Sequence, residues 1–545
     1  MQKKKGISIA VLIVTVIIMM ILAGVVIIGL NNGEIINMTN EVGVTAQTRN
    51  EKIVLDNVIS TSLKKNIFGS LTAQELQNSI DELSLNMTAM DNGKTIVVKF
   101  DDVDKYYEIK PNGKILGTIE IVKDSTPGAF DGAGTQDDPF IIMSIEDLVY
   151  FSKEVNVNKK KYENKYVMLG RNLNFNSELS YVDANTTEYD EYLGGDGTAG
   201  LKEQLTTGLG FRPIGENTNF HFAGNFDGND NEISNLKVDV TGYAGIFGYA
   251  RGTIKNLGVA GNIISSSEVA GGVVGCAGNL KVTNCYSKGD VISNKKSAGG
   301  IIGRVWSATI TINGCENYAT IDSYHNGSGG MIGYVGGSTV TIRNSCNFGL
   351  ITTNRKVTHH GVGGVVGAYM SGNRLIIENC YNLGEIRADF KLDAGYQGAG
   401  GIISYINKSN TLIRNSINFG EINSKEVNMG GIIGRAQDVS TVTIDINRCY
   451  FKNDIIKKAV GSGIAEELGI GKSQADTIIQ GFVNELNGNI ESGCPYEVEN
   501  NDGTVETVKV DTTGWAKWVY NENSYPTLDL TTIWDGTQWV KTNNN

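Results

Sequence analysis

Cysteine and histidine are the residues of this 545-residue chain with the widest chemical range: there are seven cysteines and four histidines. No two cysteines have the C-x-x-C spacing of a structural zinc site. Four cysteines and two serines occupy one equivalent position of a sequence repeat: Cys285, Cys315, Cys380, Cys449, Ser345 and Ser416. We interpret that slot as a small side chain facing the interior, because cysteine and serine replace each other there. A disulfide between Cys285 and Cys315 stays open as an alternative, although an odd number of cysteines argues against a complete disulfide framework.

No catalytic or cofactor-binding constellation is recognisable in the sequence. The histidines are scattered at positions 221, 325, 359 and 360, and the adjacent pair would point to opposite faces of a strand. Residues 469–473 end like a phosphate-binding loop, but Glu466 stands where its first glycine is required. Residues 227–231 begin like a calcium loop, but Glu232 replaces the turn glycine, so we favour solvated turns there and at 131–138. We therefore expect no metal, no cofactor and no enzymatic activity.

The C-terminus concentrates four of the five tryptophans within its last 31 residues: Trp515, Trp518, Trp534 and Trp539. Exposed aromatic rings could bind glycans. The same rings could instead form a cap that shields the final strands of a repeat array. We favour the cap.

Composition excludes several protein classes. Glycine is abundant (68 residues) and proline is rare (6 residues), which excludes collagen because collagen needs both. The net charge of −12 gives no electrostatic reason to bind nucleic acid, so we expect no nucleic-acid partner.

A glycine motif recurs seven times along the chain, at residues 244–248, 271–275, 299–303, 329–333, 363–367, 400–404 and 430–434. Successive copies are 27, 28, 30, 34, 37 and 30 residues apart, which is the period of a solenoid. Most copies are followed by a β-branched run and then by an Asn with a Gly five residues later, as at Asn284 and Gly289. Residues 214–494 contain no proline, so every backbone N–H there can join a ladder.

This pattern predicts a mainly β fold, a parallel β-helix or β-solenoid of about 30-residue coils. Glycine permits close backbone approach and positive φ at the corners of each coil. Asparagine tolerates the left-handed conformation, and stacked asparagines can hydrogen-bond to one another along the axis.

The N-terminus predicts a membrane segment. Three lysines in residues 1–6 precede an uncharged stretch, 7–28, which as a helix would be about 33 Å long and could cross a bilayer. The lysines place the N-terminus in the cytoplasm and the remainder outside the cell. Residues 31–65 read as a polar continuation with an apolar stripe at Leu55, Ile59 and Leu63. A helix at 72–85 and strands at 94–100, 106–109 and 114–122 follow, and 123–139 marks a boundary.

Residues 3–10 and the apolar run behind them resemble the type IV prepilin-like N-terminus common in Firmicutes. The resemblance implies that a prepilin peptidase cleaves after Gly6 and that Ile7 is N-methylated. The fifth mature position is Val11, where many pilins carry the Glu that pairs with a neighbouring subunit. Polymerisation into a filament therefore stays open.

The glycine repeats, together with the 132–148 and 213–229 segments before them and the 482–487 and 524–528 segments after them, resemble the GLUG repeat of bacterial surface proteins. The resemblance implies a β-helical surface domain without naming a ligand. The expected organisation is a leader at 1–6, a transmembrane helix at 7–30, and a stalk with a small α+β pilin-like module at 31–122. After these we expect a linker at 123–139, then a beginning and cap of the solenoid at 140–243. The repeats at 244–455 and a closing helix and cap at 456–545 come next.

We expect a single-pass membrane protein of the cell surface that displays its solenoid for binding or adhesion to a glycan, a matrix component or another cell. Two alternatives stay open. One is a polysaccharide lyase or hydrolase on the β-helix, for which Asp290, Glu385 and Glu421 are candidate carboxylates. The other is a minor subunit of a pilus-like filament.

Processing of the N-terminus is directly testable. Intact-mass and peptide mass spectrometry of the protein from its native membrane should find a mature chain that begins at Ile7 with a methylated amine. A mature chain that retains residues 1–6 would contradict the prepilin-like route and leave an uncleaved anchor.

Overall fold

The computed structural model describes residues 46–65, 71–85, 87–91, 95–100, 105–110, 113–119, 130, 132–176, 190–193, 205, 208, 210–353, 361–388, 398–424, 428–438, 440, 442–454, 456–464, 469–499, 504–522 and 524–542. The chain divides into two compact units, Met1–Gly69 and Ser70–Asn545. The positions expected for the leader and the membrane segment, Gly6 and Ile7 included, lie outside the described residues. None of the helices that are described is both long and apolar enough to cross a membrane.

Helix α2 (Ala46–Lys65) is the described part of the first unit. Leu55, Val58 and Ile59 are buried along one side of it, as the predicted apolar stripe requires, whereas Leu63 is only half-buried.

A small α+β module opens the second unit. Its helix α3 (Ala73–Glu82) begins with a capping box, in which Thr72 Oγ1 accepts from the Glu75 N–H and Glu75 Oε2 accepts from the Thr72 N–H. Four antiparallel strands follow in sequential order: β1 (Met87–Asp91), β2 (Ile96–Phe100), β3 (Lys105–Ile109) and β4 (Ile115–Ile119). Three of them correspond to the predicted strands. Strand β1 was not predicted because its sequence, Met-Thr-Ala-Met-Asp, has no β-branched run, although the Asn92-Gly93 pair after it is a hairpin turn signal.

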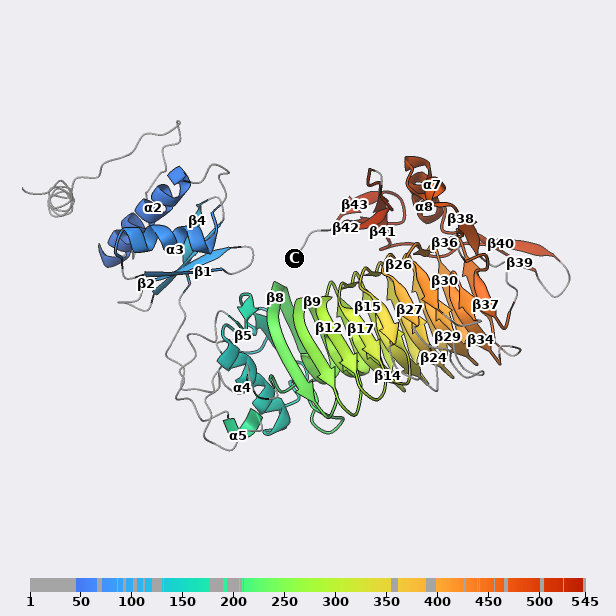
Figure 1. Ribbon diagram of the computed structural model, residues 1–545, viewed down its shortest axis with the longest axis horizontal. Coiled ribbons are helices and arrows are strands. Elements are labelled where there is room, and N and C mark those ends of the chain that lie inside the picture. The colour runs from blue at the N-terminus through green and yellow to red at the C-terminus, as the bar shows by residue number, and fades with distance from the viewer. Residues whose placement is uncertain are drawn as a thin grey trace, which may run out of the picture. The chain divides into compact units, whose positions relative to one another are not determined.

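The parallel β-solenoid predicted from the repeats forms the rest of the second unit, and its coils follow one another in Figure 1. The first coils contain β5 (Phe140–Ile142), β6 (Tyr166–Leu169), β7 (Leu173–Asn174), β8 (Asn225–Val240), β9 (Phe247–Ser265), β10 (Ala270–Gly271), β11 (Val274–Thr283) and β12 (Tyr286–Ser293). The next two are β13 (Ala298–Gly299), β14 (Ile302–Trp306), β15 (Thr309–Asn313), β16 (Glu316–Asn317) and β17 (Thr320–Ser323), then β18 (Ser328–Gly329), β19 (Ile332–Gly336), β20 (Thr339–Arg343), β21 (Cys346–Asn347) and β22 (Ile351–Thr353).

The later coils repeat this five-strand order. They contain β23 (Val362–Gly363), β24 (Val366–Met370), β25 (Arg374–Glu378), β26 (Tyr381–Asn382) and β27 (Ile386–Ala388), then β28 (Ala399–Gly400), β29 (Ile403–Asn407), β30 (Asn410–Arg414), β31 (Ile417–Asn418) and β32 (Ile422–Ser424). The stack ends with β33 (Met429–Gly430), β34 (Ile433–Gln437), β35 (Ile444–Asn447), β36 (Tyr450–Lys452), β37 (Val460–Ser462) and β38 (Ile470–Lys472). Parallel pairing thus extends from β5 to β38, on both sides of the seven repeats.

Glycine is required where two coils approach at the start of each turn. The two-residue strands there form a parallel sheet in the order β10-β13-β18-β23-β28-β33. A Cβ on Gly300 would lie 2.2 Å from the Gly330 carbonyl oxygen and 2.3 Å from Asn317 Oδ1. The glycine motif is therefore a packing requirement of each coil.

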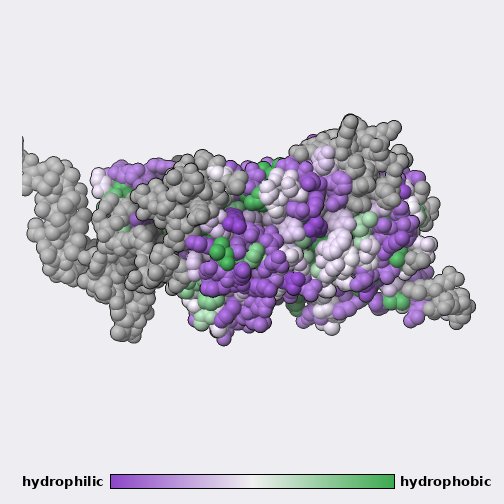
Figure 2. Space-filling view, turned by 90° about the horizontal axis from the view of Figure 1, so that it is seen from below, coloured by the Kyte–Doolittle hydropathy of each residue, from purple (hydrophilic) through white to green (hydrophobic). Residues whose placement is uncertain are grey.

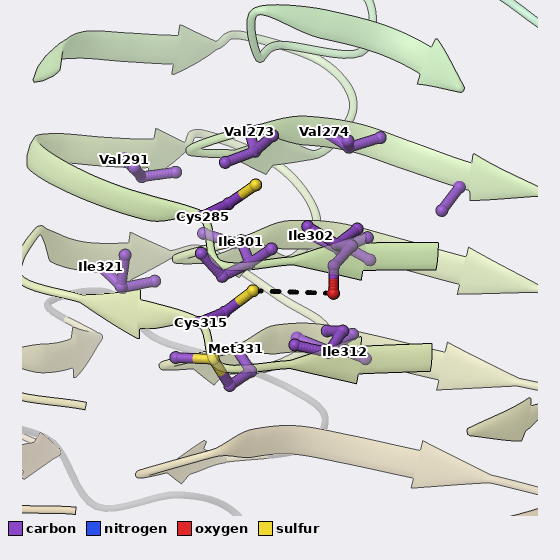
Figure 3. Close-up of a cluster of buried hydrophobic side chains, with 14 of the residues drawn as sticks. Val273, Val274, Cys285, Val291, Ile301, Ile302, Ile312, Cys315, Ile321 and Met331 are labelled. Atoms are coloured by element: carbon purple, nitrogen blue, oxygen red, sulfur yellow. Dashed lines mark hydrogen bonds between the residues drawn. The ribbon is translucent and has the colours of Figure 1, made fainter. Parts of the chain in front are cut away.

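The interior of the solenoid is a column of aliphatic side chains, in which Val273, Ile301 and Met331 take the same place in successive coils (Figure 3). Cys285 and Cys315 point into this core, and Cys380, Cys449, Ser345 and Ser416 are buried in the same slot, so the predicted inward-facing small residue is confirmed. All seven cysteines are buried free thiols. Burial raises the pKa of Cys380 to about 12, which keeps this thiol neutral.

Asparagine side chains hydrogen-bond to one another along the stack, as predicted, and they form two separate ladders. In the inner ladder, Asn317, Asn347, Asn382 and Asn418 are buried and stacked in register. Each Nδ2 donates forward to Oδ1 of the next coil, at 2.6 Å from Asn317, 2.7 Å from Asn347 and 2.7 Å from Asn382. Nδ2 of each rung also donates to the carbonyl two residues on, as from Asn382 to Gly384.

The outer ladder lies at the corner before this strand and consists of Asn256, Asn284, Asn344, Asn379 and Asn415, all with φ between 43° and 55°. Its amides donate backward: Asn379 Nδ2 to Asn344 Oδ1 at 2.9 Å, and Asn415 Nδ2 to Asn379 Oδ1 at 3.0 Å. Gly314 (φ 64°) interrupts the ladder, and Asn344 Nδ2 donates to Asn313 Oδ1 instead. The left-handed asparagines predicted from the sequence are therefore confirmed.

Separate elements flank the stack. Helix α4 (Ile145–Asn156) begins with a capping box formed by Ser144 and Asp147, and its Leu148 and Phe151 join the same core as Phe226 of the first coils. The short helix α5 (Asp190–Leu193) follows it. After the last coil come α7 (Gln474–Thr477), α8 (Gln480–Glu491), β39 (Tyr496–Glu499), β40 (Val505–Val508), β41 (Ala516–Val519), β42 (Thr527–Trp534) and β43 (Trp539–Lys541). The side of the molecule shown in Figure 2 is mostly hydrophilic, with small separate hydrophobic patches.

We expect the substitution Asn382→Ala to lower the free energy of unfolding by about 2 kcal/mol or more, because it leaves Asn347 Nδ2 and Asn418 Oδ1 buried without their ladder partner. Chemical denaturation followed by circular dichroism measures the change. The control is Asn423→Ala at an exposed position, which should cost less than about 0.5 kcal/mol. Equal effects of the two substitutions would contradict a stabilising role of the inner ladder.

Candidate binding groove

A polar groove of about 970 Å³ lies on the side of the first coils. Strands β8, β9 and β12 form its floor, and the chain around β7 forms one edge. Its lining residues are mostly amide and charged side chains: Asn172, Asn174, Asn176, Asn235, Asn262, Asp230, Glu232, Asp239, Lys237, Lys288 and Tyr286. Such a surface offers many hydrogen-bond donors and acceptors next to one aromatic ring.

The parallel register brings Glu232 and Tyr286 together although they are 54 residues apart in sequence. Glu232 pairs with Gly258, and Gly258 pairs with Tyr286, so the three occupy one column on successive strands. A Cβ on Gly258 would lie only 2.3 Å from Cζ of Tyr286, so the ring lies across the bare backbone of β9. The Tyr286 hydroxyl therefore reaches Glu232 and donates to its Oε2 at 2.8 Å.

Lys288 completes a three-residue cluster. Its ammonium donates to the same Glu232 Oε2 at 2.9 Å and lies 4.6 Å from the centre of the Tyr286 ring. Burial, with the hydrogen bond and negative charge of Glu232, raises the pKa of Tyr286 above its ordinary value. The phenol therefore stays protonated at neutral pH and donates its one proton to Glu232, which leaves its oxygen as an acceptor for a ligand.

The C-terminal tryptophans lie elsewhere. Trp515 and Trp518 are 0% and 1% exposed. Together with α8 and β41–β43 they form a C-terminal module, residues 480–542, that packs on the side of the stack against Cys346, Tyr381, Ile417 and Tyr450. The ring centres of Trp534 and Trp539 lie 5.3 Å apart, and both rings pack on the margin of this cluster. The indoles of Trp515 and Trp518 thus hold the module to the solenoid and offer no open ring face to a glycan.

A short docking segment, residues 514–518, binds the outer ladder through its backbone and through the Trp518 indole. Asn344 Nδ2 donates to the Gly514 carbonyl at 2.9 Å, and Asn344 Oδ1 accepts from the Ala516 N–H at 2.8 Å. Asn379 Nδ2 donates to the Ala516 carbonyl at 2.8 Å, and Asn379 Oδ1 accepts from Trp518 Nε1 at 2.7 Å. The module also supplies Asn489, whose Nδ2 donates to Asn415 Oδ1 at 3.1 Å and continues the ladder.

The structure also shows the surroundings of the other candidate residues from the sequence. His221 is buried with its Nδ1 at 2.9 Å from the Thr218 carbonyl, and His325 Nδ1 lies 2.7 Å from Asn326 Oδ1. His359 and His360 lie outside the described residues. Asp227 forms an ion pair with Lys255, and Glu385 forms one with Arg387. Within the described ranges, no group of three His, Cys, Asp or Glu residues is placed to hold a metal ion.

Sequence reasoning missed the one tryptophan that is exposed. The Trp306 side chain is 57% exposed and stacks on Tyr334 of the next coil, with ring centres 6.2 Å apart and planes 7° apart. Gly336 makes room for it, because a Cβ there would lie 2.7 Å from the indole. Only the register, which places Gly336 beside Trp306, could have revealed this flat aromatic pair.

Comparisons with known proteins add little about function. No family model matches the chain. A part of it is similar to halomucin of Haloquadratum walsbyi, with 28% identity over 150 residues, which are 27% of this chain and 1% of halomucin. A solved structure of a putative immunoglobulin A1 protease from Bacteroides ovatus aligns with 18% identity and a TM-score of 0.40, covering 69% of this chain and 93% of that one. Neither likeness assigns an activity or a ligand to this chain.

Release of the C-terminal module has a spectroscopic signature. Asn379→Ala should shift tryptophan emission to longer wavelength, because Asn379 bonds both the Ala516 carbonyl and the Trp518 indole. Asn487→Ala should do the same without touching the ladder, since Asn487 bonds only the backbone of Trp518. Asn423→Ala is the control. Unchanged emission in both variants would show that these amides do not hold the module.

Proposed function

We propose that this chain is a cell-surface binding protein whose solenoid presents the polar groove to a ligand. The observation that carries the proposal is the groove itself: about 970 Å³ lined by amides, with Tyr286 and Lys288 held in place by Glu232. These side chains stand on paired parallel strands, so the rigid stack fixes the donors and acceptors before a ligand arrives. Preorganisation of this kind lowers the entropic cost of binding.

Display at the surface is part of the same proposal. It is supported by the lysines and the apolar run of residues 1–28, by their resemblance to a prepilin-like N-terminus, and by the resemblance of the repeats to the GLUG repeat. On this proposal the chain is a single-pass membrane protein, processed by a prepilin peptidase at Gly6, with its solenoid outside the cell. Its role there is adhesion to a glycan, a matrix component or another cell.

An enzyme is the second candidate, and the Tyr286–Glu232–Lys288 cluster is the observation that favours it. A tyrosine beside a carboxylate and an ammonium in a polysaccharide-sized groove could take part in proton transfer. Two facts favour binding over catalysis. The raised pKa keeps the Tyr286 phenol protonated. The Lys288 ammonium is already paired with the Glu232 carboxylate.

The experiment is a binding screen of the full-length chain against immobilised glycans, matrix proteins and whole cells. We expect a ligand whose affinity falls about tenfold or more in Glu232→Gln, which removes the charge that holds Lys288, and in Tyr286→Phe, which removes the hydrogen bond to Glu232. Glu421→Gln, at an exposed carboxylate on a later coil, should leave the affinity unchanged. A ligand that binds all three variants equally would contradict the groove as its site.

The same samples separate binding from catalysis. Polysaccharides incubated with the chain should be recovered at full length. Release of unsaturated or shortened sugars, lost in Glu232→Gln, would replace the binding proposal by the enzymatic one.

A further inference from the structure

The docking segment shows how the outer ladder can hold an extended polypeptide. An asparagine side chain offers two N–H donors and two acceptor lone pairs. In Asn344 and Asn379, one N–H donor and one acceptor lone pair bond to neighbouring rungs of the ladder. The other donor and the other lone pair bond to residues 514–518. All four valences of both amides are thus satisfied. Beside them, Tyr381 is hydrogen-bonded to Cys346 of the preceding coil. Its ring packs against the ring of Trp518, with ring centres 5.4 Å apart. We call Asn344, Cys346, Asn379 and Tyr381 the covered site.

The same four positions occur a second time, earlier in the stack and without a cover. Asn256 and Asn284 are neighbouring left-handed rungs of the ladder, with φ of 53° and 52°. Two residues after them come Gly258 and Tyr286, which pair in register as Cys346 and Tyr381 do. In both places a small residue is followed, one coil later, by a tyrosine that leans back over it. We call Asn256, Gly258, Asn284 and Tyr286 the open site.

Hydrogen-bonding capacity is left over at the open site. Asn284 is exposed and Asn256 is half-buried. Among the described residues, their side chains bond only along the ladder: Asn284 Nδ2 to Asn256 Oδ1 at 3.3 Å, and Asn256 Nδ2 to Asp227 Oδ1 at 3.0 Å. One donor and at least one acceptor lone pair on each amide are therefore not used by any other described residue, as those of Asn344 and Asn379 would be without residues 514–518. Gly314 separates the two sites, so they are discrete.

We propose that the open site binds an extended segment of another protein that carries a tryptophan, in the way the covered site binds residues 514–518. Two backbone groups would bond the outward valences of Asn256, and the indole N–H would bond Asn284 Oδ1 while its ring packs on Tyr286. The segment belongs to a different protein, because Trp515 and Trp518 of every copy are already buried in its own module. This inference rests on the proposed function, since Tyr286 also lines the groove, and it names the class of ligand.

The test uses a fluorescent peptide with the sequence of residues 512–520, Thr-Thr-Gly-Trp-Ala-Lys-Trp-Val-Tyr, as a mimic of the partner segment. Fluorescence anisotropy with the full-length chain should show one saturable site. Asn284→Leu should weaken binding about tenfold or more, because it removes the acceptor for the indole and one donor. Asn423→Leu, on an exposed asparagine far along the chain, is the matched control. A peptide with alanine in place of its second tryptophan should lose binding to the same extent.

A photo-crosslinking version of the peptide, with benzoylphenylalanine in place of the first tryptophan, locates the site. Adducts on residues 256–288 support the inference. Adducts confined to 344–381 would show that the peptide displaces the chain's own segment, and they would overturn it. So would equal affinity for the Asn284→Leu and Asn423→Leu proteins, or no peptide binding at all. If a glycan or another ligand still depends on Glu232 in that case, the groove keeps its function and only the peptide assignment fails. Self-association abolished by Asn284→Leu would make the occupant a second copy and contradict the partner we assign.

Discussion

In-register stacking is the constraint on which the whole solenoid depends. Equivalent positions of successive coils lie about 4.8 Å apart, so each side chain must pack against its own counterpart above and below. Aliphatic residues meet this requirement inside the stack, glycines meet it where backbones touch, and asparagines meet it because an amide both donates and accepts. A column of like charges would repel itself. The chain avoids such repulsion in the column of Glu232, Gly258 and Tyr286. Only Glu232 is charged there, Gly258 has no side chain, and Tyr286 is a neutral hydrogen-bond donor.

The same constraint decides what the sequence could reveal. The glycine motif, the left-handed asparagines, the inward cysteine slot and the capping box at Ser144 are local signals, and each was predictable from residue type and spacing. The solenoid followed from their period. The groove was not predictable, because it depends on which residues 54 positions apart share a column, and coil lengths that vary from 27 to 37 residues hide that register.

The place of the C-terminal module was hidden for a different reason. Four clustered tryptophans indicate a buried cluster but not the surface that buries it. That surface is the outward column of Cys346, Tyr381, Ile417 and Tyr450, whose members are separated by whole coils and look like ordinary alternating strand residues. The module therefore lies along the side, where this apolar column and the outer ladder coincide, and one side of the stack is half covered and half open. Ligand recognition, on our proposals, belongs to the open half.

The two asparagine ladders have opposite directions. Inner amides donate toward the C-terminal end of the stack and outer amides donate toward its N-terminal end. Each row of aligned carboxamides would, alone, add up to an electric dipole along the axis, growing with every coil. Running antiparallel, the two rows largely cancel. Adding one rung to each ladder thus adds little charge separation between the two ends of the stack.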